Sequence, residues 1–418
     1  MYFTPYVPIL GTSSSVDPLG FLQPSAALAD LLFKQFTVLS HHPAYHGFLC
    51  FVLNYLDETG YGSGVDLATN IRDMEIFWGM LSLRTNGESI LNVTKYRRLP
   101  ADGLTLAKAR KNRSLYERLS YGTLGHYTGP SVRWALLEEG GRRLTQDGRD
   151  LGEAWGSRGK TPFATLLKKW LADKNVLDSP LEDLSPYCVS GEPSEKEQAV
   201  WQRIIKTCQE VPISGALWEE PLKSETLDLA EKEETYHRFF PAVREHYSRH
   251  EQLQQRLSLC QHFEEICALV QCVFDWAYRR KSLVDNVGAQ ASPPEESVLL
   301  ALKESIKKFH SVSSLDKPPW KLPGRLESCS SYSALEDSII LHHCEHQRRK
   351  GAAPFMDTEK ILMSGRVDEG RIATLVEKFN GSPERITPLA AWVYRRGWYF
   401  WNAYRWLQYA GRISDDRA

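Results

Sequence analysis

Apolar side chains recur at helical spacing along most of the chain. Within residues 65–83, the side chains of Leu67, Ile71, Met74 and Trp78 fall three or four positions apart. That spacing places them on one stripe of a helix. Residues 253–280 carry a wider apolar stripe, which predicts a central helix that is packed on more than one side.

The same periodicity predicts several more helices. They are expected at residues 25–37, 42–58, 194–210, 224–250, 295–311, 333–349, 358–379 and 388–411. Ser194 and Glu197 form a capping box at the start of one of them. Pro241 predicts a bend in another, because proline lacks the amide donor that a helix interior needs.

One short segment departs from the helical pattern. Val132–Leu137 reads as a strand, Glu139-Gly140-Gly141 as a turn and Arg142–Leu144 as a return strand, since glycine adopts positive φ readily. The expected fold is therefore mainly α, a multi-helix protein with a small β-hairpin in its first half.

The residues that follow the turn resemble a known structural motif. The phrase Arg142-Arg143-Leu144-Thr145-x-x-Gly148-Arg149-x-Leu151 is similar to the wing and following helix of winged-helix domains. This resemblance implies DNA contact, with a preceding helix in the major groove and the wing arginines on phosphates. Winged helices also serve as protein-docking modules, so that alternative stays open.

Proline and glycine suggest how the chain is divided. Residues 175–193 contain three prolines and a glycine and are the best candidate for a linker. We expect an N-terminal helical region at 1–94, a basic winged-helix-like region at 95–175 and a C-terminal helical domain at 194–418.

The distribution of charged residues along the chain is more informative than the overall composition. The 418 residues carry 51 Lys and Arg against 52 Asp and Glu, a formal net charge of −1. Residues 95–169 alone hold 16 basic and 7 acidic residues, a net of +9, whereas residues 178–235 hold 5 basic and 14 acidic residues. A basic segment with interspersed tyrosines suits a phosphate backbone.

The basic side chains of this region are the predicted nucleic-acid contacts. They are Arg97, Arg98, Lys108, Arg110, Lys111, Arg113, Arg142 and Arg143. The alternative is that they form a solvated face or pair with acidic segments of the same chain.

The last predicted helix is unusually aromatic. Nine of the 18 residues from Trp392 to Tyr409 are aromatic, and they leave almost no polar face. Such a helix is expected to be buried, either in the core of the protein itself or against a partner that contacts Trp398, Trp401 and Arg405. Base stacking on the rings is a third alternative.

Histidines and acids give weaker signals. Three pairs share the i, i+4 spacing of metal ligands: His42 and His46, His246 and His250, and His342 and His346. No HExxH motif and no further ligands accompany them, so no metal is assigned. Asp275 and Glu75 lie in apolar helices, where a salt bridge such as Asp275 with Arg279 is the simpler interpretation.

Several enzyme classes are disfavoured by their missing motifs. The chain has no GxxxxGK[ST] or GxGxxG loop and no GxSxG elbow. We therefore predict no catalytic residue and no cofactor.

Short stretches near the start add a second resemblance. Asp17-Pro-Leu-Gly20, Pro24-Ser-Ala and Tyr45–Phe51, with the later Arg-Leu-Thr-x-x-Gly-Arg phrase, look like uncharacterised bacterial proteins from anti-phage defence loci. This resemblance implies a multi-gene defence or DNA-maintenance role, and no catalytic residues come with it.

These patterns lead to one functional hypothesis and two alternatives. The lack of a long apolar run, of a signal peptide and of paired cysteines favours a cytoplasmic protein without membrane contact. We expect a non-catalytic DNA-associated subunit that also holds a protein partner, such as an ATPase or nuclease subunit. A metal-dependent nuclease and a pure protein scaffold are the alternatives.

Overall fold

Helices dominate the part of the chain that the structure describes. The computed structural model describes residues 17–37, 42–61, 66–85, 91, 93–99, 103–117, 122–177, 179–282, 295–312, 320–363, 375, 378, 385–396 and 398–413. Within these residues there is no strand, only two isolated antiparallel bridges, Leu137 with Leu144 and Met356 with Ile361. The mainly α prediction is confirmed, whereas the predicted hairpin is not.

The chain divides into two compact units. Unit 1 comprises Met1–Leu32 and Leu222–Trp398, and unit 2 comprises Phe33–Pro221 and Tyr399–Ala418. The predicted boundaries at 94, 175 and 194 are not boundaries of these units. The predicted linker packs within unit 2, where Trp78 Nε1 donates to the Tyr187 carbonyl at 2.6 Å.

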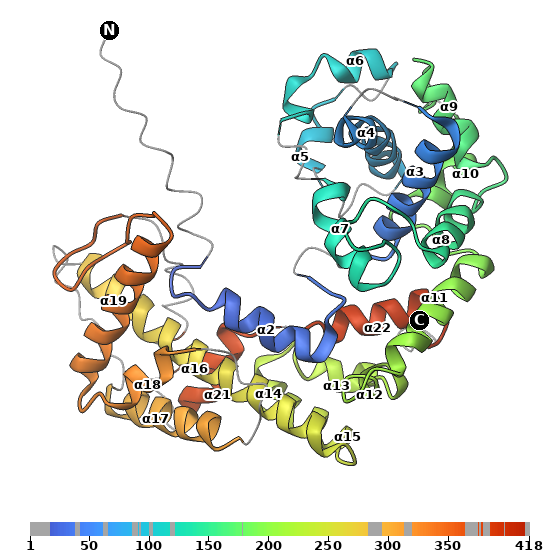
Figure 1. The fold of residues 1–418 in the computed structure, drawn as a ribbon. Coiled ribbons are helices and arrows are strands. Elements are labelled where there is room, and N and C mark those ends of the chain that lie inside the picture. Colours follow the sequence, from blue (N-terminus) through green and yellow to red (C-terminus); the bar gives the residue numbers. More distant parts are fainter. Residues whose placement is uncertain are drawn as a thin grey trace, which may run out of the picture. The chain divides into compact units, whose positions relative to one another are not determined.

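Unit 2 is built around two helices. They are α3 (Ala44–Thr59) and α4 (Leu67–Thr85), and Figure 1 shows the neighbours of α4 distributed around it. The remaining elements of this unit are α5 (Val93–Tyr96), α6 (Leu106–Arg110), η1 (Arg113–Leu115), α7 (Thr123–Arg133), α8 (Gln146–Gly156), α9 (Phe163–Leu171), α10 (Leu181–Leu184), η2 (Ser185–Tyr187), α11 (Glu195–Gln209), α12 (Ala216–Glu219) and α22 (Phe400–Tyr409).

Two glycines allow α3 and α8 to approach closely. A Cβ at Gly47 would lie 2.4 Å from the Trp155 ring, and a Cβ at Gly152 would lie 2.8 Å from the Cys50 backbone. Neither position has room for a side chain, so glycine sets the distance between these two helices.

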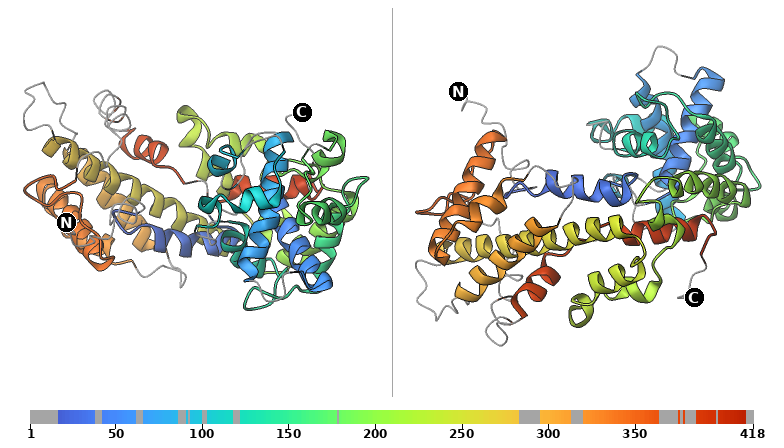
Figure 2. Two further views of the ribbon diagram at one scale, coloured as in Figure 1. Left: turned by 90° about the horizontal axis from the view of Figure 1, so that it is seen from above. Right: turned by 60° about the horizontal axis from the view of Figure 1, so that its bottom comes forward.

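Unit 1 is organised along one long helix. It is α16 (Glu251–Ser282), and it packs against α17 (Glu295–Ser311), α19 (Tyr332–Arg349) and α21 (Ile386–Val393) (Figure 2). The shorter helices of this unit are α13 (Ser224–Asp228), α14 (Glu233–Tyr236), α15 (Phe239–His246) and α18 (Leu322–Glu327); α2 (Leu22–Phe33) belongs to it up to Leu32. The central helix predicted at 253–280 is thus confirmed.

Three predicted elements differ from the structure. The helix predicted at 224–250 is three short helices, because turns separate them and the Thr235 hydroxyl donates to the Leu229 carbonyl after α13. The helix predicted at 388–411 is split into α21 and α22, since Trp398 and Tyr399 have φ of 43° and 63°, outside the helical region. The strand predicted at Val132–Leu137 is wrong at its start, because Val132 and Arg133 belong to α7.

Some predictions fall where little or nothing is described. Most of the helix predicted at 358–379 lies outside the described residues. None of the helices that the structure does describe has both the length and the apolar character needed to cross a bilayer.

A tryptophan cluster forms the core of unit 2. Trp406 of α22 stacks on Trp134 with ring centroids 5.4 Å apart, and Trp201 and Trp218 each meet Trp134 edge to face. All four rings are at most 1% exposed. The aromatic helix α22 therefore fills the core of its own unit.

Candidate nucleic-acid interface

The predicted phosphate contacts gather where α5, α6 and η1 pack beside α4. Lys95 Nζ donates to the Ser114 carbonyl at 2.7 Å, which fixes the end of α5 to η1. Thr105 caps α6 through the Lys108 amide, and Asn112 caps η1 through the Ser114 amide. These local bonds place short basic segments that are far too short to be stable helices alone.

Five of the predicted cations are exposed on these segments. They are Arg97, Arg98, Lys108, Lys111 and Arg113. In the described parts of residues 93–117 the only acidic residue is Glu117. We call these five side chains the α5–η1 basic surface. All five lie in unit 2.

Arg110, by contrast, belongs to a structural ion pair. Its Nη2 lies 2.5 Å from Oδ2 of Asp73, a side chain that is 0% exposed, and the Tyr116 hydroxyl donates to Asp73 Oδ1 at 2.6 Å. The hydrogen bond with Asp73 raises the pKa of Arg110 above its ordinary value. Because its charge compensates a buried carboxylate, the half-exposed Arg110 is less available to a phosphate than the five cations of the α5–η1 basic surface.

The predicted wing carries no net charge. Arg142 and Arg143 are exposed, and so are Glu138 and Glu139 in the same turn. The Glu138 amide donates to the Arg143 carbonyl at 2.9 Å, and the turn closes through glycines with positive φ. This short loop displays two positive and two negative charges, which weakens the case for phosphate binding at its tip.

The helix before the wing offers few contacts for bases. α7 contains a single Lys or Arg, Arg133, whose Nη1 donates to the Lys34 carbonyl at 2.9 Å. Two of its residues, Gly125 and Gly129, are exposed without any side chain. α7 lacks the donors that usually read base edges.

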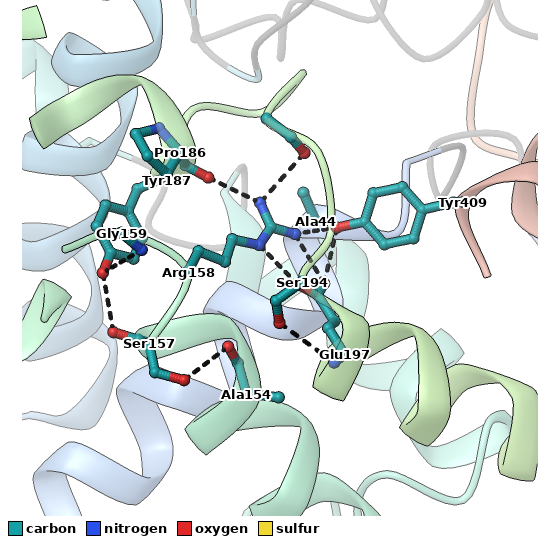
Figure 3. A network of polar contacts seen from close by, with 12 residues as sticks. Ala44, Ala154, Ser157, Arg158, Gly159, Pro186, Tyr187, Ser194, Glu197 and Tyr409 are labelled. Carbon is teal, nitrogen blue, oxygen red and sulfur yellow. Dashed lines mark hydrogen bonds and ion pairs between the residues drawn. The ribbon is translucent and has the colours of Figure 1, made fainter. Parts of the chain in front are cut away.

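A second basic side chain of this region, Arg158, is buried in a polar network (Figure 3). Its guanidinium binds Glu197 through Nε at 2.6 Å and Nη2 at 2.7 Å, and the two side chains are 1% and 0% exposed. Nη1 donates to the carbonyls of Pro186 and Gly191. Tyr409 accepts from Arg158 and donates to Glu197 at 2.7 Å.

This network ties α22 to the rest of unit 2. It joins the residues after α8 to the first turn of α11 and the last residue of α22. No local pattern in the sequence indicates this network, because Glu197 lies 39 positions from Arg158 and 212 positions from Tyr409. It also removes one of the 16 basic residues of 95–169 from any surface.

Histidines of two of the three predicted pairs make contacts inside their own units. His46 is buried, hydrogen-bonds Ser131 at 2.7 Å, and burial lowers its pKa to about 3. His342 Nε2 donates to the Leu19 carbonyl at 2.9 Å, and the neighbouring His343 donates from Nδ1 to the Pro18 carbonyl at 2.8 Å. Among the described residues, no group of three or more His, Cys, Asp or Glu side chains is arranged to hold a metal ion.

The two buried acids are also structural. Glu75 accepts both the amide and the hydroxyl of Thr123 and pairs with Arg72 at 3.0 Å. Burial raises the pKa of Glu75, and Arg72 opposes that shift. Asp275 accepts a hydrogen bond from Gln271 at 2.8 Å and another from the Tyr394 hydroxyl.

The predicted partner contacts are only partly at the surface. Trp398 is 4% exposed and meets Phe263 edge to face in the core of unit 1, so its ring is not available to a partner. Trp401 is half-buried and Arg405 is exposed on α22. Contact with a partner stays a prediction for these last two residues.

Comparison with known proteins adds no relative to this description. No protein-family model, no curated protein and no solved structure matches the chain. Any function must therefore be argued from the geometry above and from the sequence.

Proposed function

We propose that the chain is a non-catalytic, DNA-associated subunit of a multi-protein bacterial complex. The observation that supports this proposal is the α5–η1 basic surface, where five exposed cations outnumber two exposed acids, Glu117 and Asp173, whose Oδ1 accepts the Ala107 amide of α6 at 2.7 Å. Lys and Arg side chains held on one surface bind the phosphate backbone by displacing its condensed counterions.

The proposed contact is with phosphates rather than with bases. Helix α7 presents exposed glycines and a single Arg, and the turn with Arg142 and Arg143 is electrically neutral. Direct base readout needs side-chain donors and acceptors in a groove. Binding should therefore depend strongly on salt and weakly on DNA sequence.

A protein partner is the second part of the proposal. The exposed acidic side chains within residues 179–221 of unit 2 and the exposed Arg405 of α22 are candidates for such a contact, and an ATPase or nuclease subunit is a suitable partner. The resemblance to anti-phage defence-locus proteins supports a role in defence or DNA maintenance.

The test is a binding titration with a charge-reversed variant. A fluorescein-labelled duplex of about 25 base pairs is titrated with the protein at 50 mM salt, and anisotropy is recorded. The variant Arg98→Glu, Lys111→Glu, Arg113→Glu should bind at least 10-fold more weakly. The matched control is Lys196→Glu, Lys206→Glu, which reverses two exposed charges on α11 in the same unit.

Two results would overturn the proposal. One is the absence of binding by the unaltered protein at 50 mM salt. The other is an equal loss of affinity in the control and in the α5–η1 variant, which would indicate a general charge effect. Cleavage of the duplex with added Mg²⁺ would instead support the nuclease alternative.

A further inference from the structure

Unit 1 contains a basic cleft that the proposed function does not use. The cleft has a volume of about 740 Å³ and is bordered by the start of α2, by residues 320–325 and by the last three turns of α19. A volume between roughly 300 and 1,000 Å³ is typical of sites for small molecules. The space is therefore large enough for a ligand of nucleotide size.

The charge of this cleft is strongly positive. Its border includes five Lys or Arg side chains and two acids, a net of three positive charges. The basic residues are Lys321, Arg325, Arg348, Arg349 and Lys350. The local excess is unlike the unit as a whole, because the chain outside residues 95–169 carries more acidic than basic residues.

Both acids at the cleft already have partners. Glu345 pairs with Arg325 at 3.0 Å. Asp17 caps α2 by accepting the amides of Phe21 at 2.8 Å and Leu22 at 3.2 Å. Among the described residues, no carboxylate pairs with Lys321, Arg348 or Arg349, and all three are exposed.

Two histidines line the wall between these groups. The rings of His342 and His346 stack with centroids 6.4 Å apart, and His342 Nε2 donates to the Leu19 carbonyl. Burial is the main cause that lowers the pKa of each ring, and Asp17 partly opposes it at His346. At neutral pH the positive charge of the cleft therefore comes from Lys and Arg.

The remaining border is apolar. Trp320, Leu322 and Pro24 line the cleft beside the charged groups. The Trp320 ring is held by Phe263 at 4.7 Å and by Phe309 at 5.9 Å, so this wall is preorganised by the core of unit 1. An apolar wall beside a cationic one suits a molecule that combines a hydrophobic part with phosphates.

We propose that this cleft binds a nucleotide-sized molecule with two or more phosphate groups. Arg348, Arg349 and Lys321 contact the phosphates, and Trp320 and Leu322 face the less polar part. Arginine suits this role because its planar guanidinium binds phosphate oxygens in pairs. The cleft lies in unit 1 and the α5–η1 basic surface in unit 2, so either proposal can fail alone.

Calorimetry on the full chain tests the site with three probes: ATP, inorganic pyrophosphate and adenosine. ATP should bind, pyrophosphate should compete with it, and adenosine should bind at least 10-fold more weakly than ATP. The variant Arg348→Gln, Arg349→Gln should lose at least 10-fold in ATP affinity. Lys321→Gln, on a different element, should weaken binding in the same direction even if the double variant folds poorly.

The control variant is Lys307→Gln, an exposed lysine on α17 that does not line the cleft. It should bind ATP as the unaltered protein does, and circular dichroism should show equal helix content in all variants. No binding of ATP at millimolar concentration would overturn the proposal. So would equal affinity for adenosine and ATP, or binding that Arg348→Gln, Arg349→Gln and Lys321→Gln leave unchanged.

Discussion

Replacing Arg158 by methionine should destabilise unit 2 strongly. Methionine keeps much of the length of the side chain but removes its charge and its donors. Glu197 would then be a buried carboxylate, 0% exposed, and Tyr409 would be its one remaining side-chain donor among the residues that the structure describes. Breaking a buried ion pair in this way costs about 3–5 kcal/mol, because the remaining charge is left without compensation.

The matched control is an exposed ion pair in the same unit. Arg203 lies 2.7 Å from Asp147 and 2.6 Å from Asp150, but its side chain is 50% exposed. Exposed pairs contribute about 0–1 kcal/mol, since water solvates the separated charges well. Arg203→Met should therefore cost much less than Arg158→Met, although both substitutions remove an arginine that pairs with a carboxylate at 2.6 to 2.7 Å.

Urea unfolding followed by tryptophan fluorescence measures the difference. The core of unit 2 contains Trp134 and Trp406, so its unfolding should change the emission. The double variant Arg158→Met, Glu197→Gln should recover part of the loss, because it removes the unpaired charge. Equal midpoints for Arg158→Met and Arg203→Met would refute the claim that this network holds α22 in the unit.

Three further predictions concern other parts of the molecule. Burial raises the pKa of Glu264 to about 7, so the folded state keeps a proton that the unfolded state releases near pH 4.5. The free energy of unfolding should therefore fall by about 3 kcal/mol as the pH rises from about 4.5 to 7. Urea titrations at several pH values should show this loss in the unaltered protein and not in Glu264→Gln. Gly152→Ala should lower the melting temperature, because its Cβ would meet the α3 backbone at 2.8 Å, whereas Gly129→Ala, with no atom within 4 Å, should raise it slightly. All eight cysteines are buried, so a thiol reagent should label the folded protein slowly and should label all eight thiols once the protein is unfolded. Rapid labelling of the native protein would show that the thiols are accessible and would contradict their burial.

The sequence predicted helices well where a cap or an apolar stripe within the helix itself determines its position. The capping box at Ser194 and Glu197 opens α11 as expected, with the Ser194 hydroxyl accepting the Glu197 amide at 3.3 Å. Gly60, with φ of 61°, ends α3 as a left-handed cap. Periodicity also located α16 and α19, because their apolar stripes pack against neighbours in unit 1.

The predictions that failed share a physical reason, because the features concerned are determined by contacts with residues far away in the sequence or by backbone angles. Arg110 was predicted as a phosphate contact, but its guanidinium pairs with the buried carboxylate of Asp73, which lies 37 positions away in the sequence. Arg158 contributes to the net charge of residues 95–169, but its buried partner Glu197 lies 39 positions further along the chain and outside that segment. The break between α21 and α22 reflects backbone angles at Trp398 and Tyr399 that periodicity alone does not reveal.

The sequence therefore predicted the segment that carries the basic surface, but not which of its basic residues are displayed there. Five of the eight predicted basic contacts lie on the α5–η1 basic surface, one is used internally, and two lie in a neutral turn. The cleft beside α19 was not predicted, because Lys321 and Arg325 lie more than 20 positions before Arg348, Arg349 and Lys350, and the packing of α18 against α19 brings the two groups together.

The salt dependence of DNA binding is the strongest test of phosphate contact by the α5–η1 basic surface. Each cation that contacts a phosphate contributes about 0.9 to the slope of log K against log salt. The slope measured between 50 and 300 mM salt should become less steep by about 2.7 in the variant Arg98→Glu, Lys111→Glu, Arg113→Glu, and should be unchanged in Lys196→Glu, Lys206→Glu. An identical slope for the unaltered protein and the α5–η1 variant would contradict the account.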